Sequence, residues 1–67
     1  MLYVVTESYK NMTYKKFTYF SNREMAMQHA LYVQEEVDEV IVEEYIEKDG
    51  RFFIRQTLVH WGEEDEE

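Results

Sequence analysis

The sequence predicts an α+β fold with four strands and one helix, in the order β-β-α-β-β. Two observations support this prediction. β-Branched and aromatic residues are concentrated in four short segments, which is typical of strands. Between the second and third segments lies a single stretch in which small and apolar residues recur at helical spacing. The simplest architecture is a four-stranded antiparallel sheet with one helix packed on one face.

The first two strands are predicted at residues 2–9 and 12–20, joined by a two-residue turn at Lys10-Asn11. Asn favours this turn because it tolerates positive φ. In the resulting register, the face expected to lie under the helix carries Leu2, Val4, Phe17 and Tyr19, with Val4 opposite Phe17. The opposite face carries Tyr3, Val5, Glu7, Tyr9, Tyr14 and Lys16.

The helix is predicted from a capping box, with Ser21 at the N-cap and Glu24 at position N3. Phe20 and Met25 flank this box as a hydrophobic staple would. We expect the helix to end at about Val37. Its buried stripe is expected to consist of Ala26, Ala30, Val33 and Val37, flanked by Met27 and Leu31.

The last two strands are predicted at residues 38–47 and 51–61, around the turn Lys48-Asp49-Gly50. A two-residue loop and a three-residue loop both fit this turn. A shift of one residue in register moves every side chain of a strand to the other face. The choice of turn therefore decides which side chains are buried.

The two turns differ in the charges that they bring together. A two-residue loop sets Lys48 opposite Arg51, so that like charges meet. A type I turn with a glycine bulge pairs Glu47 with Arg51 and Glu43 with Arg55. We predict the second turn, because charge pairing and burial then agree. It places Val40, Val42, Ile46, Phe52, Ile54 and Leu58 under the helix, together with Glu44 and Gln56, which are expected to hydrogen-bond or to lie beyond the helix.

The sheet face without a helix is predicted to be rich in aromatic and charged residues. From the second hairpin it would carry Ile41, Tyr45, Phe53, Val59 and Trp61, interleaved with Glu39, Glu43, Glu47, Arg51 and Arg55. Exposed apolar patches beyond a few hundred Å² are uncommon on monomers, and Tyr, Trp and Arg are enriched at binding hot spots. We expect another chain to cover this face. The alternative is that the aromatic residues only stabilise a small sheet through cross-strand pairs.

The composition of this chain excludes several classes of site. Sixty-seven residues correspond to one domain, predicted at 1–62, followed by an acidic, disordered tail at 63–67. The chain has no Cys, which excludes disulfides and thiolate metal sites. His29 and His60 are expected to be structural or surface residues. No nucleophile-base pair and no glycine-rich phosphate loop is present, so we predict a non-enzymatic protein without cofactors.

Charge is distributed unevenly along the sequence. Residues 1–33 carry four basic and two acidic residues, a net charge of +2, whereas residues 34–67 carry three basic and thirteen acidic residues, a net charge of −10. The cluster of Glu35, Glu36, Asp38 and Glu39 lies where the helix is expected to end. Anions there oppose the helix dipole, so a functional surface is one reason to retain them; solubility is the other. The acidity argues against direct nucleic-acid binding.

In size, acidity and lack of cysteine, the chain resembles the small inhibitor proteins encoded by bacteriophages, some of which block host DNA-binding enzymes by charge mimicry. The resemblance is one of kind and involves no motif. It implies an inhibitor or regulator that binds a basic protein in the host cytoplasm. A cytoplasmic protein is also what the N-terminus predicts, since it has neither a signal peptide nor a membrane span. The predicted contacts are Tyr45, Phe53 and Trp61 as aromatic anchors, and Glu35, Glu36, Asp38, Glu39, Glu43 and Glu47 as carboxylates.

The second hypothesis is structural. The open faces or edges of the sheet would pack together in a homodimer or larger homo-oligomer. In that case the acidic residues would serve solubility alone.

Overall fold

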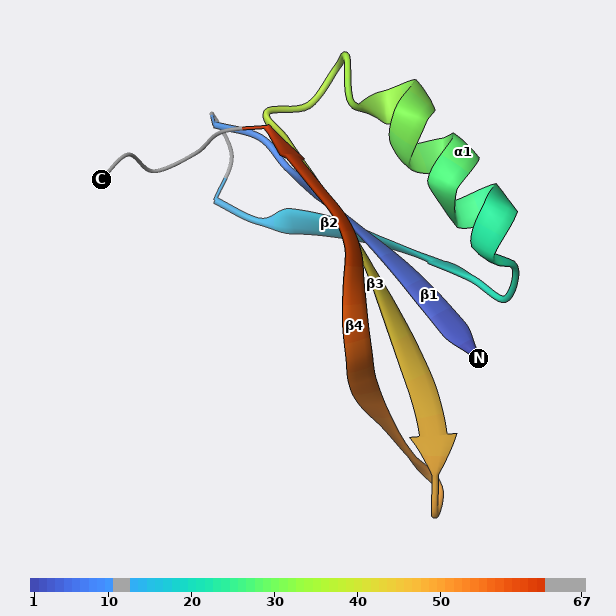
Figure 1. Ribbon diagram of the computed structural model, residues 1–67. Coiled ribbons are helices and arrows are strands. Elements are labelled where there is room, and N and C mark those ends of the chain that lie inside the picture. Colours follow the sequence, from blue (N-terminus) through green and yellow to red (C-terminus); the bar gives the residue numbers. More distant parts are fainter. Residues whose placement is uncertain (11–12, 63–67) are drawn as a thin grey trace.

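The computed structural model describes residues 1–10 and 13–62 and confirms the predicted α+β architecture (Figure 1). One antiparallel sheet has the strand order β2-β1-β3-β4, and the helix packs across one of its faces. The elements are β1 (Leu2–Ser8), β2 (Lys15–Phe20), α1 (Arg23–Val33), β3 (Glu39–Lys48) and β4 (Arg51–Gly62). The predicted tail at 63–67 and Asn11 of the first turn lie outside the described residues. No helix in the described part is long and apolar enough to cross a membrane.

The core lies between α1 and the two central strands. Its buried members are Tyr3, Val5, Ala26, Ala30, Val33, Val40 and Val42. The predicted stripe of Ala26, Ala30 and Val33 is therefore confirmed, and Val37 packs against the core from beyond the helix end. Two alanines let the helix axis approach the sheet closely, and the β-branched valines of β1 and β3 present a compact surface to them.

The first hairpin differs from the prediction in register and in orientation. Val4 lies opposite Tyr19 rather than Phe17, a shift of two residues that leaves the grouping of side chains unchanged. The helix, however, covers the side of Tyr3 and Val5, not the side of Val4. The physical reason is fit: a close-packed alanine stripe suits the valine surface better than the protruding rings of β2.

The second hairpin turns through the two-residue loop Asp49-Gly50, so the predicted glycine bulge is wrong. Asp49 has φ 56° and Gly50 has φ 79°, and a type I′ turn requires positive φ at both positions. Lys48 lies opposite Arg51. The twist of this turn matches that of the strands, and both long side chains are exposed, so solvent screens their repulsion.

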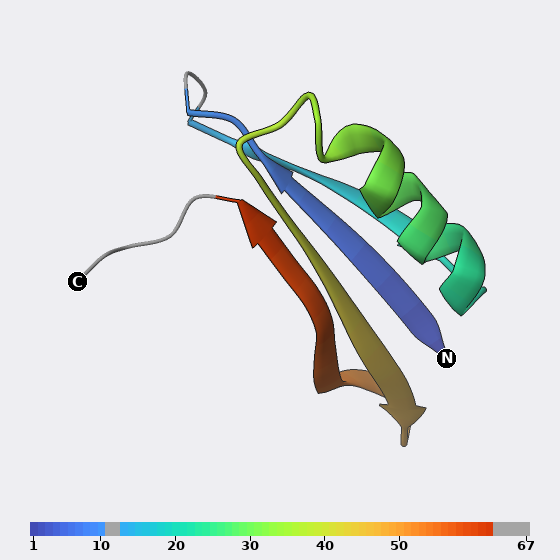
Figure 2. The same ribbon diagram turned by 45° about the horizontal axis from the view of Figure 1, so that its top comes forward.

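Two irregularities in β4 change the face of the residues between them, Gln56 and Thr57. The register shifts between Glu44 and Tyr45 and between Val42 and Glu43, which leaves Arg55 and Leu58 as extra residues on β4. Figure 2 shows that β4 bends along its length. The two-residue turn puts Phe52 and Ile54, which precede both shifts, on the side away from the helix. The two shifts cancel in side-chain alternation, so Val59 and Trp61 lie on the helix side and pack against the core. The predicted places of these four residues are wrong.

The helix begins one residue later than predicted. Asn22 is the N-cap, and its Oδ1 accepts a hydrogen bond of 3.1 Å from the backbone N–H of Met25. The helix ends at Val33, before the predicted Val37, and short turns follow. Glu35 and Glu36 would have been in its last turn, where negative charge opposes the helix dipole.

The end of β4 is fixed by a close approach of two backbones. Gly62 has φ 116°, and a Cβ atom placed on it would lie 2.2 Å from the carbonyl oxygen of Asp38. Only glycine fits there without a shift of the chain. Asp38 is itself held to β1, because its N–H donates to the carbonyl of Ser8 at 3.0 Å and its carboxylate accepts from the N–H of Lys10.

Candidate functional site

The sheet has two chemically different sides, the covered face under α1 and an open face without a helix (Figures 1 and 2). The register assigns the open face to Leu2, Val4, Thr6, Ser8, Lys15, Phe17, Tyr19, Glu39, Ile41, Glu43, Tyr45, Glu47, Phe52, Ile54, Thr57 and His60. Four of these apolar side chains expose more than half of their surface: Phe17, Tyr19, Phe52 and Ile54. Phe17 and Tyr19 lie on edge strand β2 and Phe52 and Ile54 on edge strand β4, with the two central strands between them. Exposed apolar side chains on one sheet face are typical of interaction surfaces.

The carboxylates of the open face are not neutralised by the arginines, as the predicted register required. Glu43 lies opposite Val4 and Thr57, and Glu47 lies opposite Phe52. Within residues 1–10 and 13–62, no ion pair joins either of these glutamates to a lysine or arginine. Burial raises the pKa of the Tyr45 phenol, and the nearby negative charge of Glu43 raises it further. The open face is therefore both apolar and negatively charged.

The acidic cluster predicted after the helix does not present four free carboxylates. Glu35 and Glu36 are exposed in the turns after α1. Asp38 accepts the hydrogen bond from the Lys10 backbone, and Glu39 Oε2 lies 2.5 Å from the Nε2 of His60. Half of this cluster is thus committed to contacts within the fold. A small hollow beside it is lined by Gln34, Val37, Asp38, Glu39, Val40, Trp61 and Gly62.

The three predicted aromatic anchors do not share a surface. Tyr45 is half-buried on the open face. Phe53 lies opposite Ile46 on the other side of the hairpin, and Trp61 packs against the core. Sequence reasoning missed the exposed aromatic residues of the open face, and the signal that identifies Phe52 was present in the two-residue Asp49-Gly50 turn that we rejected.

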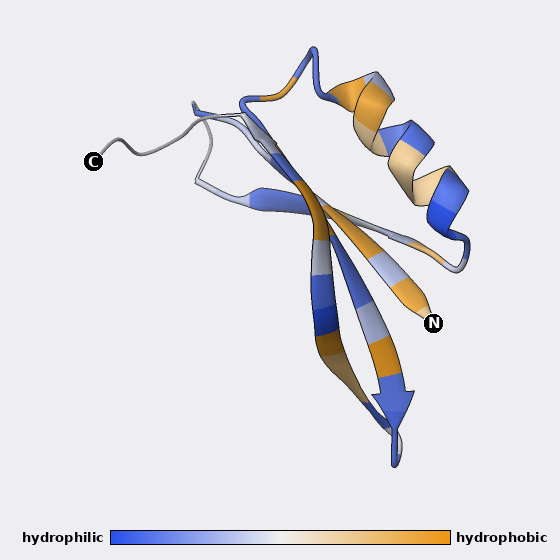
Figure 3. Cartoon of the chain, viewed as in Figure 1, coloured by the Kyte–Doolittle hydropathy of each residue, from blue (hydrophilic) through white to orange (hydrophobic). Residues whose placement is uncertain are grey.

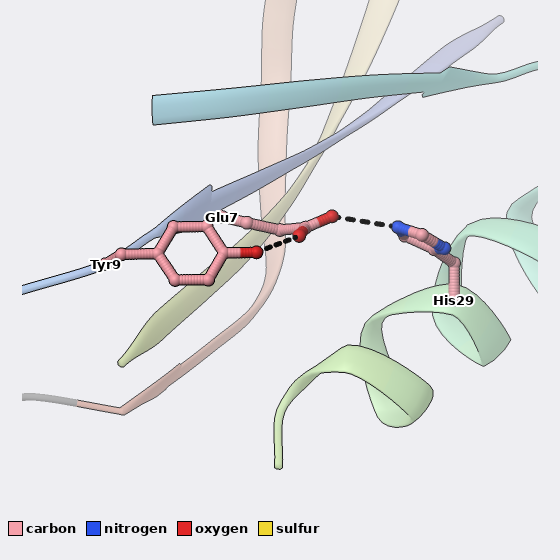
Figure 4. Close-up of polar contacts among 3 residues, drawn as sticks. All are labelled: Glu7, Tyr9 and His29. Carbon is pink, nitrogen blue, oxygen red and sulfur yellow. Dashed lines mark hydrogen bonds and ion pairs between the residues drawn. The ribbon is translucent and has the colours of Figure 1, made fainter. Parts of the chain in front are cut away.

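The covered face holds a buried carboxylate at Glu7, which is only 1% exposed (Figure 4). The hydroxyl of Tyr9 donates to Glu7 Oε1 at 3.3 Å, and His29 Nε2 of the helix lies 2.9 Å from Oε2. The ring of Phe20 lies against the His29 imidazole, with centroids 5.3 Å apart. Burial and the neighbouring carboxylate raise the pKa of Tyr9. This cluster ties the helix to β1.

A second covered carboxylate, Glu44, is 5% exposed and bridges three strands. It accepts hydrogen bonds from Gln56 Nε2 at 2.7 Å and from the Tyr3 hydroxyl at 3.2 Å. The hydrogen bond from Gln56 lowers the pKa of Glu44 more than burial raises it. Of the two predicted outcomes for Glu44 and Gln56, the structure shows the hydrogen bond. Both buried glutamates are therefore satisfied within the fold.

Hydropathy along the strands agrees with this division. Figure 3 shows that β3 carries both hydrophobic and hydrophilic residues and ends in hydrophilic residues at the hairpin. Among the described residues, no group of three or more His, Asp or Glu side chains is placed to hold a metal ion. Comparisons of the chain with protein-family models, curated proteins and solved structures give no match.

Proposed function

We propose that this protein is a non-enzymatic binding module whose open face engages a basic protein and thereby inhibits or regulates it. The observation that supports this proposal is the combination of four exposed apolar side chains with two carboxylates, Glu43 and Glu47, that have no lysine or arginine partner in the described chain. Aromatic side chains supply binding energy in desolvated contacts. Carboxylates at the same surface accelerate encounter with a basic partner and exclude acidic ones.

A nucleic-acid-binding protein is the partner class that fits this charge best, because such proteins carry concentrated positive charge. The open face matches nucleic acid in the sign of its charge but not in the spacing of its charges. Glu43 and Glu47 are four residues apart on one strand, about 13 Å, whereas duplex DNA carries a phosphate about every 3.4 Å of axis per strand. We therefore propose contact through aromatic residues with electrostatic steering, as a small inhibitor of a phage would use, and not a copy of the phosphate backbone.

Site-specific photocrosslinking tests this proposal with a matched pair of positions. Tyr19 is 62% exposed on the open face, and Tyr32 is 73% exposed on the outer surface of α1. A photoreactive residue replaces each tyrosine in turn, and the variants are expressed in the native host. We expect position 19 to crosslink a basic protein and position 32 to give no specific product. Glu43→Gln with Glu47→Gln is expected to reduce the yield at position 19 at least several-fold.

Two results would refute the proposal. One is equal crosslinking from positions 19 and 32, which would mean that exposure alone determines the products. The other is a position-19 partner whose yield is unaffected by both glutamine substitutions and by added salt, since charge-steered association weakens as ionic strength rises.

The structural alternative, a dimer of open faces, is less favourable on this charge distribution. A twofold axis brings the same surface patch of two copies together. Glu43 and Glu47 of one copy would then approach the same residues of the other, and like charges in a desolvated contact are costly. A basic surface is a better match for the open face.

A further inference from the structure

The hairpin of β3 and β4 extends beyond the rest of the sheet. β1 begins its pairing with β3 at Leu2, opposite Tyr45, so residues 46–48 and 51–53 form a two-stranded ribbon (Figures 1 and 2). Residues 51–57 are all exposed. An isolated two-stranded ribbon is only marginally stable in water. This ribbon is the part of the sheet that the rest of the fold covers least.

Both sides of the ribbon carry apolar residues. Phe52 and Ile54 lie on the open face, beside the half-buried Tyr45. Phe53 lies on the other side, opposite Ile46, and is 48% exposed. A partner that binds only the open face would leave Phe53 in water. Two contacts, one on each side, are needed to bury this hairpin.

The two sides of the ribbon carry opposite charge. The open face has Glu43 and Glu47, whereas the other side, called the basic side here, has Lys48 and Arg51, with Arg55 close enough to lower the pKa of the Glu44 carboxyl. Lys48 and Arg51 are directly opposite across the strands. Such a pair is locally unfavourable, and unfavourable local chemistry is often retained at functional surfaces.

We infer that the open face also binds a second copy of this chain, which docks there through the basic side of its own hairpin. The inference goes beyond the proposed function: it uses the same open face but gives it a different occupant. In this contact, Phe53 of one copy would meet the aromatic residues of the next, and Lys48 and Arg51 would meet Glu43 and Glu47. Different surfaces are joined, so the contact is head-to-tail and can repeat from copy to copy.

Charge favours this occupant over an anionic membrane. The apex of the hairpin carries Asp49, which would enter the headgroup layer first. This carboxylate would oppose approach to an anionic surface. The second copy offers carboxylates to the basic side, and cations to Glu43 and Glu47, which have no lysine or arginine ion pair among the described residues.

A charge-swap experiment tests the inference. One variant carries Glu43→Lys with Glu47→Lys, and the other carries Lys48→Glu with Arg51→Glu. The second keeps a like-charge pair across the strands, so its hairpin should be as stable as that of the wild type. The control, Glu35→Lys with Glu36→Lys, makes the same change in net charge as the first variant but in the turns after α1. Sedimentation velocity across a range of protein concentrations measures the assembly state.

We expect the average mass of the wild type and of the control to rise with concentration, and each hairpin variant alone to stay monomeric. An equimolar mixture of the two hairpin variants should regain association, because lysines on one open face then meet glutamates on the other basic side. A monomeric wild type at millimolar concentration, a mixture that stays monomeric, or a closed dimer unaffected by the swaps would each overturn the inference.

The outcome is separable from that of the proposed function. If position 19 crosslinks a foreign basic protein and the wild type is monomeric, the proposed function is supported and self-association is refuted. Restored association in the mixture, with only self-crosslinks at position 19, supports the inference and removes the foreign partner.

Discussion

Glutamate side chains have opposite roles on the covered and open faces of the sheet. On the covered face, Glu7 and Glu44 are almost fully buried, and each carboxylate contacts two polar side chains of the fold. On the open face, Glu43 and Glu47 have no basic partner among the described residues. Burying a carboxylate is costly unless it is hydrogen-bonded. The first pair is therefore committed to the fold, and only the second pair is available to another molecule.

The largest expected effect is on the free energy of unfolding, and it distinguishes the buried glutamates from the exposed pair. Glu7→Ala removes a buried side chain and leaves the Tyr9 hydroxyl and the His29 imidazole without their acceptor. We expect a loss of about 2–4 kcal/mol in the free energy of unfolding, from the cavity and the lost hydrogen bonds together. Urea denaturation measures it. The matched substitution Glu43→Ala on the open face should change stability by less than about 0.5 kcal/mol; equal losses would break the comparison.

The next effect concerns how the helix is held over the covered face. Asn22→Ala removes the side-chain oxygen that caps the first turn, and should cost about 1 kcal/mol. Ser21→Ala, one residue earlier, should have little effect, because Ser21 is not the cap. Thermal denaturation of both variants decides between the two positions. A larger loss for Ser21→Ala would mean that the helix begins where the sequence alone suggested.

The pH dependence of stability gives a smaller, directional test. The pKa of Glu44 is lowered in the folded state, chiefly by the hydrogen bond from Gln56. A group with a lowered pKa contributes stability above its unfolded pKa and loses it as pH falls through the folded value. Gln56→Ala should therefore weaken the protein at neutral pH and flatten the loss of stability on acidification. Melting temperatures between neutral and acidic pH measure this; an unchanged pH profile would contradict the role of Gln56.

The smallest expected effect on the stability of the protein comes from replacing the carboxylates of the open face. Glu43→Gln with Glu47→Gln should leave the melting temperature nearly unchanged, or raise it slightly by reducing the net negative charge. A marked destabilisation would show that these carboxylates serve the fold, and would remove them from the candidate site.

The order of the elements and the helix stripe were predictable because they depend on short-range patterns. Alanines at positions 26 and 30 and Val33 fall on one helical face whatever the sheet does, and all three are buried. The cap was misplaced by one residue because Ser21 and Asn22 are both good caps. The choice between them is made by the incoming strand, which the local sequence does not describe.

The faces of β4 were not predictable from the same kind of pattern. Its two register shifts fall at Arg55 and Leu58, where no glycine or proline marks them. The two-residue turn places Phe52 on the open face and Trp61 on the core side, whereas the two shifts change the face only of Gln56 and Thr57, which lie between them. The twist required to follow the rest of the sheet decides such bulges. Charge pairing favoured Glu47 with Arg51, but turn geometry prevailed.

For the candidate site, the sequence predicted an exposed, acidic and aromatic sheet face, but it assigned Phe53 and Trp61 to that face in place of Phe17, Tyr19 and Phe52. Glu43, Tyr45 and Glu47 were placed correctly because β3 alternates without interruption. Phe17 and Tyr19 were assigned to the opposite face, since nothing local to β2 indicates which side the helix will cover.

The two irregularities of β4 also affect what this strand can do at the edge of the sheet. A regular edge strand offers an unbroken row of backbone donors and acceptors, on which another chain can add and from which fibrils can grow. Arg55 and Leu58 interrupt that row at two points along β4. A chain with many β-branched and aromatic residues thus resists fibril growth at its longest edge, and its sheet faces stay available for specific contacts.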